Sequence, residues 1–281
     1  MQIKKKFSQK QEKSFIEDGY LVVKNLISKN QIKKIQKTII NRSKNYLDTS
    51  KIFKNFYDKS FHAGLINLKK NKPERFGSFY DSLQKSLELY SIILNKKILS
   101  KVSKLSKLEL GNLSFNGENI RMDLPHDKLH HVDWHQDRSY YFQNRDGNKG
   151  LVCWIPLMNM KKNLGPLKIC KKSHIDGFVG NYKKSRKKNS STQRKITINK
   201  KYKIINKTVE EGDVLFLSKN TIHASGNNIS NFLRFSLQVR IHDLMDQNYL
   251  SFRHKIVYNE SDIKIMKTKG INISDIEKIS V

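Results

Sequence analysis

The central motif of this chain is Trp134-His135-Gln136-Asp137-Arg138-Ser139-Tyr140-Tyr141, with an imidazole and a carboxylate two residues apart. In an extended chain, residues i and i+2 point to the same face, so His135 and Asp137 can reach one metal ion if this stretch is extended. Two histidines and one carboxylate favour non-haem Fe(II), because they leave one side of the metal open for substrate and oxygen. A single His-x-Asp also occurs by chance, so the pair needs a third ligand from elsewhere in the chain.

A candidate third ligand lies in the segment Thr221-Ile222-His223-Ala224-Ser225-Gly226, directly after a strand expected at residues 213–218. The small residues beside His223 leave room for a bound group. Considered alone, a histidine at this place would be a hydrogen-bonded structural residue. The other histidines of the chain are expected to be structural: His62, His126, His130, His131, His174, His242 and His254.

Residues 231–241 alternate between apolar and polar side chains, as a strand with one buried face does. The apolar face consists of Leu233, Phe235, Leu237, Val239 and Ile241, and the polar face of Arg234, Ser236, Gln238 and Arg240. That polar face lies either in water or, if the strands close into a small barrel, on the wall of a ligand cavity. In a cavity, Arg234 could form a bidentate pair with the carboxylate of a small acid.

Helical patterns dominate up to about residue 110, interrupted by a short apolar strand at residues 20–23. Apolar residues recur at helical spacing in three groups: Phe15 and Ile16 in a helix over 8–19 that ends at Gly19; Ile32, Ile35 and Ile39 in a helix capped by Ser28; and Phe79, Leu83, Leu87, Tyr90 and Leu94 in a helix from Ser78. These apolar stripes are expected to belong to the core.

From about residue 111 the pattern changes to short strand-like runs separated by Gly and Asn. Strands are expected at residues 119–124, 150–158, 167–170, 202–209, 213–218 and 231–241. Six or more short strands suggest a sandwich or a barrel. The predicted fold is mainly β with a helical N-terminal third. It forms a single domain over residues 1–281, with a helical region at about 1–110, a β core at about 111–245 and a C-terminal extension at 246–281.

Composition narrows the class of protein. Apolar residues make up 37% of the chain, which is enough for a globular core. No apolar run is long enough to span a bilayer, and the N-terminus lacks the apolar core of a secretory signal. Cys153 and Cys170 lack metal-type spacing and are expected to be reduced and buried. These features predict a soluble, cytoplasmic protein.

The net charge of +30 has two interpretations. It can attract an anionic partner, such as nucleic acid, a membrane surface or a phosphorylated substrate. It can instead reflect an AT-rich coding sequence, since Lys, Asn and Ile are all abundant and Lys is the weaker residue for bidentate readout of phosphates or bases. Residues 182–203 concentrate this charge and are expected to form a solvated surface loop or, alternatively, a lid over an anionic substrate.

The motifs taken together and in order resemble the phytanoyl-CoA dioxygenase family. The matching segments are His135-Gln136-Asp137; Trp154-Ile155-Pro156-Leu157; Gly165-Pro166-Leu167 with Ser173-His174; Gly212-Asp213; His223 and Ser225; Arg234; and the opening segment Phe15–Val23. The likeness covers about residues 7–242. One departure is Ile169–His174, where relatives show Pro-Gly before the Ser-His, and the basic segment is another.

The resemblance implies a double-stranded β-helix, also called a jelly roll or cupin-like fold, that holds Fe(II) and uses 2-oxoglutarate and O2. Arg234, helped by Ser225, would bind the distal carboxylate of 2-oxoglutarate, and Trp154 would line the same pocket. The co-substrate would be converted to succinate and CO2 while a C–H bond of a small metabolite is hydroxylated. That metabolite could be an anion. Related halogenases lack the carboxylate ligand, so its presence favours hydroxylation. The implied iron ligands are His135, Asp137 and His223.

Substrate contacts and partners are less constrained by the motifs. Arg121, Arg138 and Tyr140 flank the predicted mouth of the pocket and could meet a substrate, although surface or supporting roles are equally compatible with their positions. A small-molecule substrate is expected, without a nucleic-acid partner or a membrane span, and the sequence does not indicate an oligomeric state. Two alternatives stay open: a non-catalytic jelly-roll binding module, and a dioxygenase directed at nucleic acid.

Overall fold

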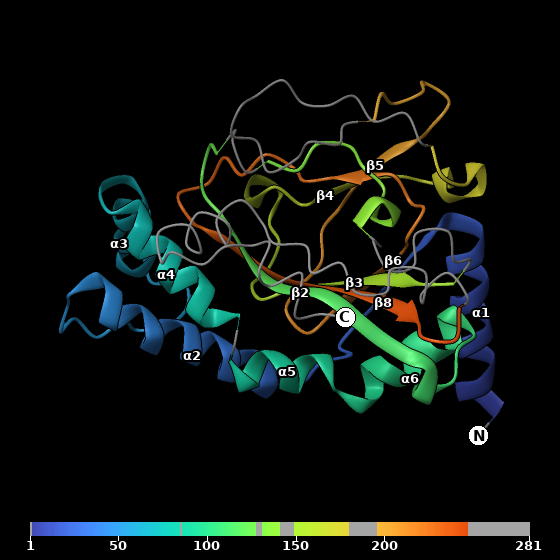
Figure 1. Cartoon of the computed structure of the whole chain (residues 1–281), viewed down its shortest axis with the longest axis horizontal. Coiled ribbons are helices and arrows are strands. Elements are labelled where there is room, and N and C mark those ends of the chain that lie inside the picture. Colours follow the sequence, from blue (N-terminus) through green and yellow to red (C-terminus); the bar gives the residue numbers. More distant parts are fainter. Residues whose placement is uncertain (1, 85, 128–130, 141–148, 180–195, 247–281) are drawn as a thin grey trace, which may run out of the picture.

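The computed structural model describes residues 2–84, 86–127, 131–140, 149–179 and 196–246 (Figure 1). Its α-helices are α1 (Gln2–Asp18), α2 (Lys29–Leu47), α3 (Lys59–Asn71), α4 (Pro73–Leu83), α5 (Leu87–Ile93) and α6 (Lys96–Ser106). Its strands are β1 (Tyr20–Val23), β2 (Leu113–Asp123), β3 (Leu151–Pro156), β4 (Leu167–Cys170), β5 (Ile204–Lys207), β6 (Val214–Ser218), β7 (His223–Ala224) and β8 (Arg234–Asp243). Short 3-10 helices are η1 (Leu110–Asn112), η2 (Asp137–Tyr140), η3 (Lys162–Leu164) and η4 (Ser173–Asp176).

The strands form two antiparallel sheets. One sheet has the order β1-β6-β3-β8-β2, and the other has the order β5-β4-β7. Side chains from both sheets line one cavity, so the sheets face each other across it, with β4 and β5 to one side of the larger sheet in Figure 1. Two facing sheets agree with the sandwich or barrel expected from the short strand-like runs, and the strand expected at 167–170 has the same bounds in the structure.

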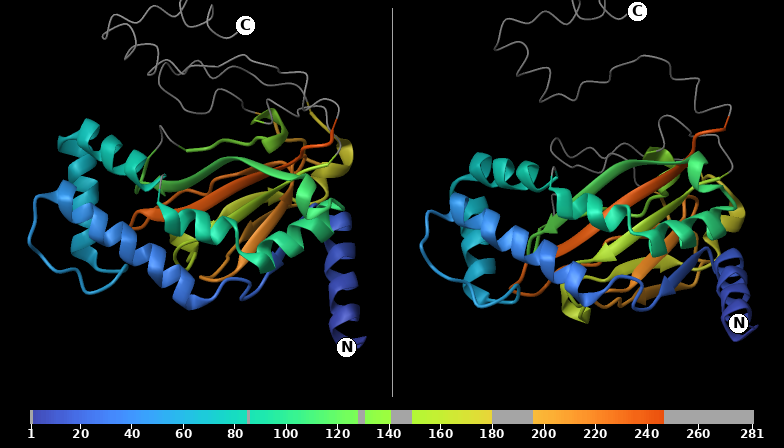
Figure 2. Two further views of the ribbon diagram at one scale, coloured as in Figure 1. Left: turned by 60° about the horizontal axis from the view of Figure 1, so that its bottom comes forward. Right: turned by 90° about the horizontal axis from the view of Figure 1, so that it is seen from below.

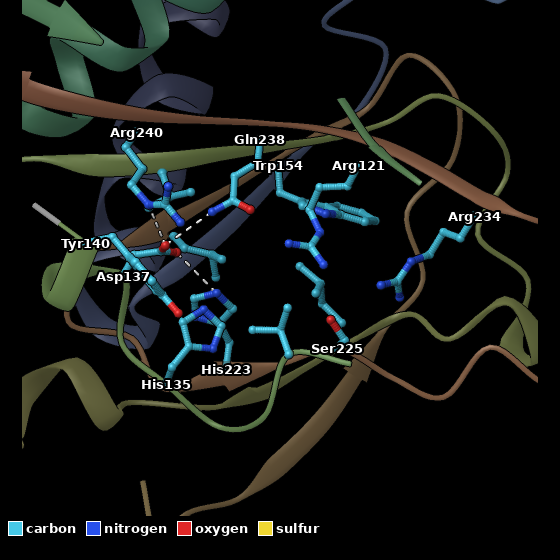
Figure 3. A pocket seen from close by; sticks show the side chains of 14 residues that line it. Arg121, His135, Asp137, Tyr140, Trp154, His223, Ser225, Arg234, Gln238 and Arg240 are labelled. Carbon is cyan, nitrogen blue, oxygen red and sulfur yellow. Dashed lines mark hydrogen bonds and ion pairs between the residues drawn. The ribbon is translucent and has the colours of Figure 1, made fainter. Parts of the chain in front are cut away.

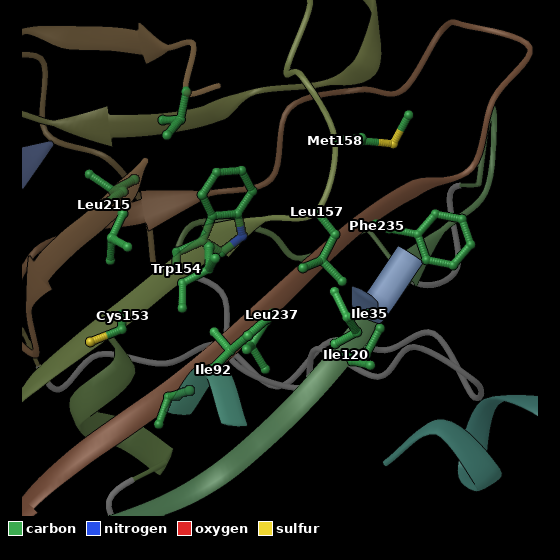
Figure 4. Packing of buried hydrophobic residues seen from close by; sticks show 14 of the residues in the cluster. Ile35, Ile92, Ile120, Cys153, Trp154, Leu157, Met158, Leu215, Phe235 and Leu237 are labelled. Atoms are coloured by element: carbon green, nitrogen blue, oxygen red, sulfur yellow. The ribbon is translucent and has the colours of Figure 1, made fainter. Parts of the chain in front are cut away.

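Helices cover the face of the larger sheet that points away from the cavity (Figure 2). The core between them joins Ile35 of α2 and Ile92 of α5 to Ile120 of β2 and Leu237 of β8, all of them fully buried (Figure 4). The apolar alternation of β8 therefore faces the helices. Its polar residues are left to point towards the cavity.

Local sequence signals account for several element boundaries. Ser28 begins α2, because its hydroxyl accepts a hydrogen bond from the backbone N–H of Gln31. Gly19 ends α1 with a φ of +78°, a conformation that glycine adopts without steric cost. The strand that follows pairs with β6, so the N-terminal segment is joined to the β core.

The prediction of one continuous helix from Ser78 is wrong. The structure has two helices there, α4 and α5, because Ser86 caps a new helix by accepting a hydrogen bond from the N–H of Leu89. The break changes the helical register, so Leu87 and Leu94 lie on the surface, 81% and 53% exposed. Ile16 of α1 is also 59% exposed, whereas Phe15 is buried as expected.

The turn before Ser173 is the place where the sequence departs from the motif of the family that it resembles. Lys172 takes up the left-handed conformation, with a φ of +66°, that a glycine would adopt more easily. The Ser173 hydroxyl then donates to the carbonyl of Cys170 and accepts from the N–H of Ile222, which ties the turn to the approach to β7.

Several expectations concern surface and terminal segments. Residues 182–195 of the basic segment and residues 247–281 of the expected C-terminal extension lie outside the described residues. Both cysteines are buried and unpaired. Within the described part of the chain, no helix combines the length and the apolar character needed to cross a membrane.

Candidate active site

Two distant segments meet at the candidate metal site. His135 and His223 form an antiparallel β-bridge, with both backbone hydrogen bonds at 3.0 Å. Their rings lie side by side, 4.3 Å between centroids. Potential ligand atoms of His135, Asp137 and His223 all lie within 4.8 Å of one another, and all three residues are buried. The three residues singled out in the sequence therefore come together.

The route by which Asp137 reaches this group differs from a simple extended strand. The chain is paired with β7 at His135, but Asp137 already begins the 3-10 helix η2. Gln136, between the two ligands, is fully buried: its amide donates to the carbonyls of Gly177 and Asn220 and accepts from the N–H of Val179. These bonds hold the bend that turns the carboxylate towards the histidines.

Backbone carbonyls set the tautomers of both histidines. Nδ1 of His135 lies 2.8 Å from the carbonyl oxygen of Asp133, and Nδ1 of His223 lies 2.9 Å from that of Thr221. Because a carbonyl only accepts, each Nδ1 carries the proton and each Nε2 keeps its lone pair for a metal. Burial and the neighbouring ring of His223 lower the pKa of His135 to about 3, so this imidazole is neutral, as a ligand must be.

Asp137 is held as a carboxylate. Burial would raise its pKa, but the Arg240 guanidinium beside it lowers the pKa below its ordinary range. Oδ1 accepts from Nε of Arg240 at 2.8 Å and from the amide of Gln238 at 3.2 Å. Oδ2 lies 3.2 Å from Nε2 of His223 and has no hydrogen-bond donor among the described residues.

These atoms fit a divalent cation. In these tautomers two imidazole lone pairs and a carboxylate oxygen lie buried within 4.8 Å of one another, an arrangement that a positive ion stabilises. Two nitrogens and one oxygen are also the donor set of non-haem iron oxygenases. The residues that would hold the metal are thus His135, Asp137 and His223.

The cavity beside this group has a volume of about 180 Å³ (Figure 3). The polar face of β8 contributes Arg234, Gln238 and Arg240 to its wall. Of the two interpretations of that face, the inward one is confirmed, since Arg234 is only 2% exposed. In Figure 3 the metal-binding group lies towards one end of the cavity and Arg234 towards the other.

Arg234 is oriented by Asp123 at the end of β2. Its Nε and Nη2 donate to Oδ2 of Asp123 at 3.0 and 2.9 Å, and its Nη1 donates to the carbonyl of Gly165. Gly165 must be glycine, because its φ is +74° and a Cβ there would lie 2.5 Å from the carbonyl oxygen of Gly226. Burial would raise the pKa of Asp123, but Arg234 and Arg121 lower it to about 2.

The other residues expected at the site divide into two groups. Ser225, Trp154, Arg121 and Tyr140 line the cavity, and Arg121 donates from Nη2 to Oδ1 of Asp123 at 3.0 Å. Arg138 is not among the described residues that line it, and its guanidinium lies over the ring of Phe178.

Three residues at the site were not assigned a role from the sequence. Gln238 and Arg240 belong to the recognised polar face of β8, yet nothing local indicates that they contact Asp137. Asp123 carries no signal except its place at the end of an expected strand. All three act through contacts between residues far apart in the chain, which a single sequence does not display.

Comparison with solved structures places this fold. SnoN, an α-ketoglutarate-dependent epimerase of nogalamycin biosynthesis, is 13% identical, with a TM-score of 0.54 over 85% of this chain and 84% of that one. EvdO2 from Micromonospora carbonacea var. aurantiaca is 14% identical, with a TM-score of 0.56 over 84% and 93%. ThoJ, a non-heme monooxygenase, is 15% identical, with a TM-score of 0.56 over 83% and 77%. At such identities the likeness shows a shared fold.

Facing antiparallel sheets with two histidines and one carboxylate beside the cavity define a non-haem iron oxygenase of the jelly-roll type. A family model, phytanoyl-CoA dioxygenase (PhyH), matches residues 15–236. The chain belongs to this family and is an Fe(II)- and 2-oxoglutarate-dependent oxygenase. None of the curated proteins compared with the sequence matches it. SnoN has been crystallised with Fe3+, α-ketoglutarate and nogalamycin RO, and EvdO2 with 2-oxoglutarate.

Proposed function

We propose that this protein, acting as a single oxygenase domain, hydroxylates a C–H bond of a small metabolite and converts 2-oxoglutarate to succinate and CO2. The observation that carries the proposal is that three potential ligand atoms lie within 4.8 Å of one another beside a cavity that also holds a buried arginine. His135, Asp137 and His223 are the proposed Fe(II) ligands. When bound, the iron and 2-oxoglutarate supply the oxidising chemistry.

Arg234 is the proposed anchor for the distal carboxylate of 2-oxoglutarate. Three of its five N–H groups donate to Asp123 and Gly165. Among the described residues, one N–H group on Nη1 and one on Nη2 therefore have no acceptor. Two such N–H groups suit the two oxygens of a carboxylate. The Ser225 hydroxyl and the indole of Trp154 line the same cavity and complete the proposed co-substrate pocket.

The remaining contribution of the protein is orientation and exclusion of water. Burial of the three ligands and of Arg234 keeps bulk water from the reacting groups, which strengthens every charge interaction in the pocket. Asp123 holds Arg234 in one orientation, so the co-substrate would bind in one direction between the arginine and the metal ligands.

A small molecule is the proposed substrate, because the site is a cavity between two sheets rather than an open surface. Arg121 and Tyr140 line it and are the proposed substrate contacts, and an anionic group on the substrate would suit the guanidinium. SnoN is an epimerase and SnoK, also of nogalamycin biosynthesis, a carbocyclase, so this fold supports outcomes other than hydroxylation. The presence of Asp137 favours hydroxylation over halogenation, because related halogenases lack this carboxylate.

Two measurements test the proposal. Anaerobic addition of Fe(II) and 2-oxoglutarate should produce a visible metal-to-ligand charge-transfer band, and its absence would favour the non-catalytic binding module. Metabolites are then screened for substrate-stimulated succinate release, with ¹⁸O2 to identify the product. Incorporation of one labelled oxygen atom supports hydroxylation, whereas an unlabelled rearranged product refutes it. Turnover confined to nucleic-acid substrates would show that the substrate class is wrong.

A further inference from the structure

Asp137 presents its two oxygens to different surroundings. Oδ1 is bound on the β8 side by Nε of Arg240 at 2.8 Å and by the amide of Gln238 at 3.2 Å. Oδ2 faces the histidines, 3.2 Å from Nε2 of His223, and has no hydrogen-bond donor among the described residues. The carboxylate is fully buried, so water does not exchange these partners. One oxygen is therefore occupied by protein donors and the other is left for a cation.

The two donors are themselves held in place. Gln238 and Arg240 are i and i+2 on β8, and β3 fixes their register by pairing Trp154 with Gln238 and Val152 with Arg240. The guanidinium of Arg240 also lies over the ring of Tyr140, 4.6 Å from its centroid. Tyr140 belongs to η2, the same short helix as Asp137. Figure 3 shows Arg240 and Gln238 reaching Asp137 from one side.

We propose that Gln238 and Arg240 are positioning residues that reserve Oδ1 of Asp137, so that this carboxylate offers the metal one oxygen, Oδ2, and not both. The inference rests on the proposed role of Asp137 as an iron ligand. A carboxylate can bind a metal through one oxygen or through both. Binding through both would occupy a position that an oxygenase of this class keeps open for 2-oxoglutarate and O2.

Removal of Arg240 would change the metal affinity in two opposite directions. A cation beside Asp137 repels a divalent metal, so on charge alone its removal would tighten metal binding. A group that orients a ligand has the reverse effect, since loss of such partners weakens metal affinity by about 10–100-fold. The coordination number of the bound metal, and not the affinity, is therefore the quantity that tests the role of Arg240.

The first experiment uses CoCl2 as the metal probe with the full-length protein, because Co(II) reports its coordination number through its visible bands. Gln238→Met keeps the length of the side chain and its neutrality but removes the donor. We expect weaker visible bands in this variant, because released Oδ1 joins the coordination sphere and raises the coordination number. An unchanged Co(II) spectrum would overturn the role of Gln238.

The second experiment compares Arg240→Gln with Arg240→Lys. We expect Arg240→Gln to weaken the visible Co(II) bands through a higher coordination number, and Arg240→Lys to restore part of the wild-type spectrum. A wild-type Co(II) spectrum in Arg240→Gln would overturn the proposal. If circular dichroism shows that Arg240→Gln does not fold, the Co(II) spectra of Gln238→Met and Arg240→Lys still test the proposal.

Arg234→Lys is the matched control, an arginine on the same face of the same strand that does not touch Asp137. It should leave Co(II) affinity and the Co(II) spectrum unchanged while weakening 2-oxoglutarate binding. An equal change in the Co(II) spectrum of this variant would mean that the effect is general to the cavity and would refute a specific role for Arg240. Failure of the wild-type protein to oxidise any substrate would instead count against the proposed function, because the Co(II) measurements need no turnover.

Discussion

Asp123 joins two arginines of the cavity, and its replacement by Asn should reduce both stability and co-substrate affinity. The carboxylate accepts from Nη2 of Arg121 on Oδ1 and from Nε and Nη2 of Arg234 on Oδ2, all at 2.9–3.0 Å. Asn keeps the shape but removes the charge and turns an NH2 donor towards one guanidinium. Arg234, only 2% exposed, would then be buried beside a neutral side chain.

The size of the effect follows from this geometry. Removing one partner of a buried ion pair costs about 3–5 kcal/mol, because the other charge stays desolvated. At roughly 2–4 °C per kcal/mol for a chain of this size, the unfolding temperature of Asp123→Asn should fall by about 6 °C or more. The 2-oxoglutarate affinity should fall as well, since Arg234 loses the group that orients it.

The pH dependence gives a second measure of the same interaction. The pKa of Asp123 is lowered from 3.8 to about 2 in the folded protein. The ionised carboxylate therefore adds to the free energy of unfolding above pH 3.8, and this contribution is lost as the pH falls towards 2. That difference corresponds to roughly 2 kcal/mol. The stability gap between the wild type and Asp123→Asn should therefore narrow by this amount between about pH 5 and pH 2.

Circular dichroism is used to monitor thermal unfolding of the metal-free protein at pH 7 and at lower pH. These curves measure both the stability loss and its pH dependence. Asp81→Asn, an exposed carboxylate of α4, is the control and should leave the unfolding temperature unchanged. Equal unfolding temperatures for the wild type and Asp123→Asn, together with unchanged 2-oxoglutarate affinity, would refute this account of Asp123.

Three further outcomes are expected. His135→Ala or Asp137→Ala should abolish succinate formation while the circular dichroism spectrum stays native, and retained turnover would contradict the ligand assignment. Arg234→Lys keeps a charge beside Asp123 but loses the planar fork, so the 2-oxoglutarate Kd should rise by about 10–100-fold, as for loss of one charge-assisted hydrogen bond. Burial lowers the pKa of His62 from 6.5 to about 4, so as the pH falls this residue is protonated in the unfolded chain before it is in the folded one. The free energy of unfolding should therefore fall by up to roughly 3 kcal/mol between about pH 6.5 and pH 4. Urea midpoints across that range measure it, and His62→Gln should show a flatter dependence.

Local periodicity explains why much of the fold was predictable. The strand at 20–23, the helix capped by Ser28 and the strand at 167–170 depend on neighbours within a few residues, and all three are confirmed. The helix expected from Ser78 was wrong because the competing cap at Ser86 is also a local signal, and the apolar spacing across the break concealed it.

By itself the sequence determined the residue types of the site: a His-x-Asp pair, a later histidine, and a strand with arginine on its polar face. Only the tertiary structure decided which of these atoms meet, which oxygen of Asp137 is left for a cation, and which carboxylate holds Arg234. The physical reason is the separation along the chain of the residues that interact. The character of a helix or a strand is set by side chains a few positions apart, whereas these contacts join residues about a hundred positions apart, and only the packing of two sheets brings them within bonding distance.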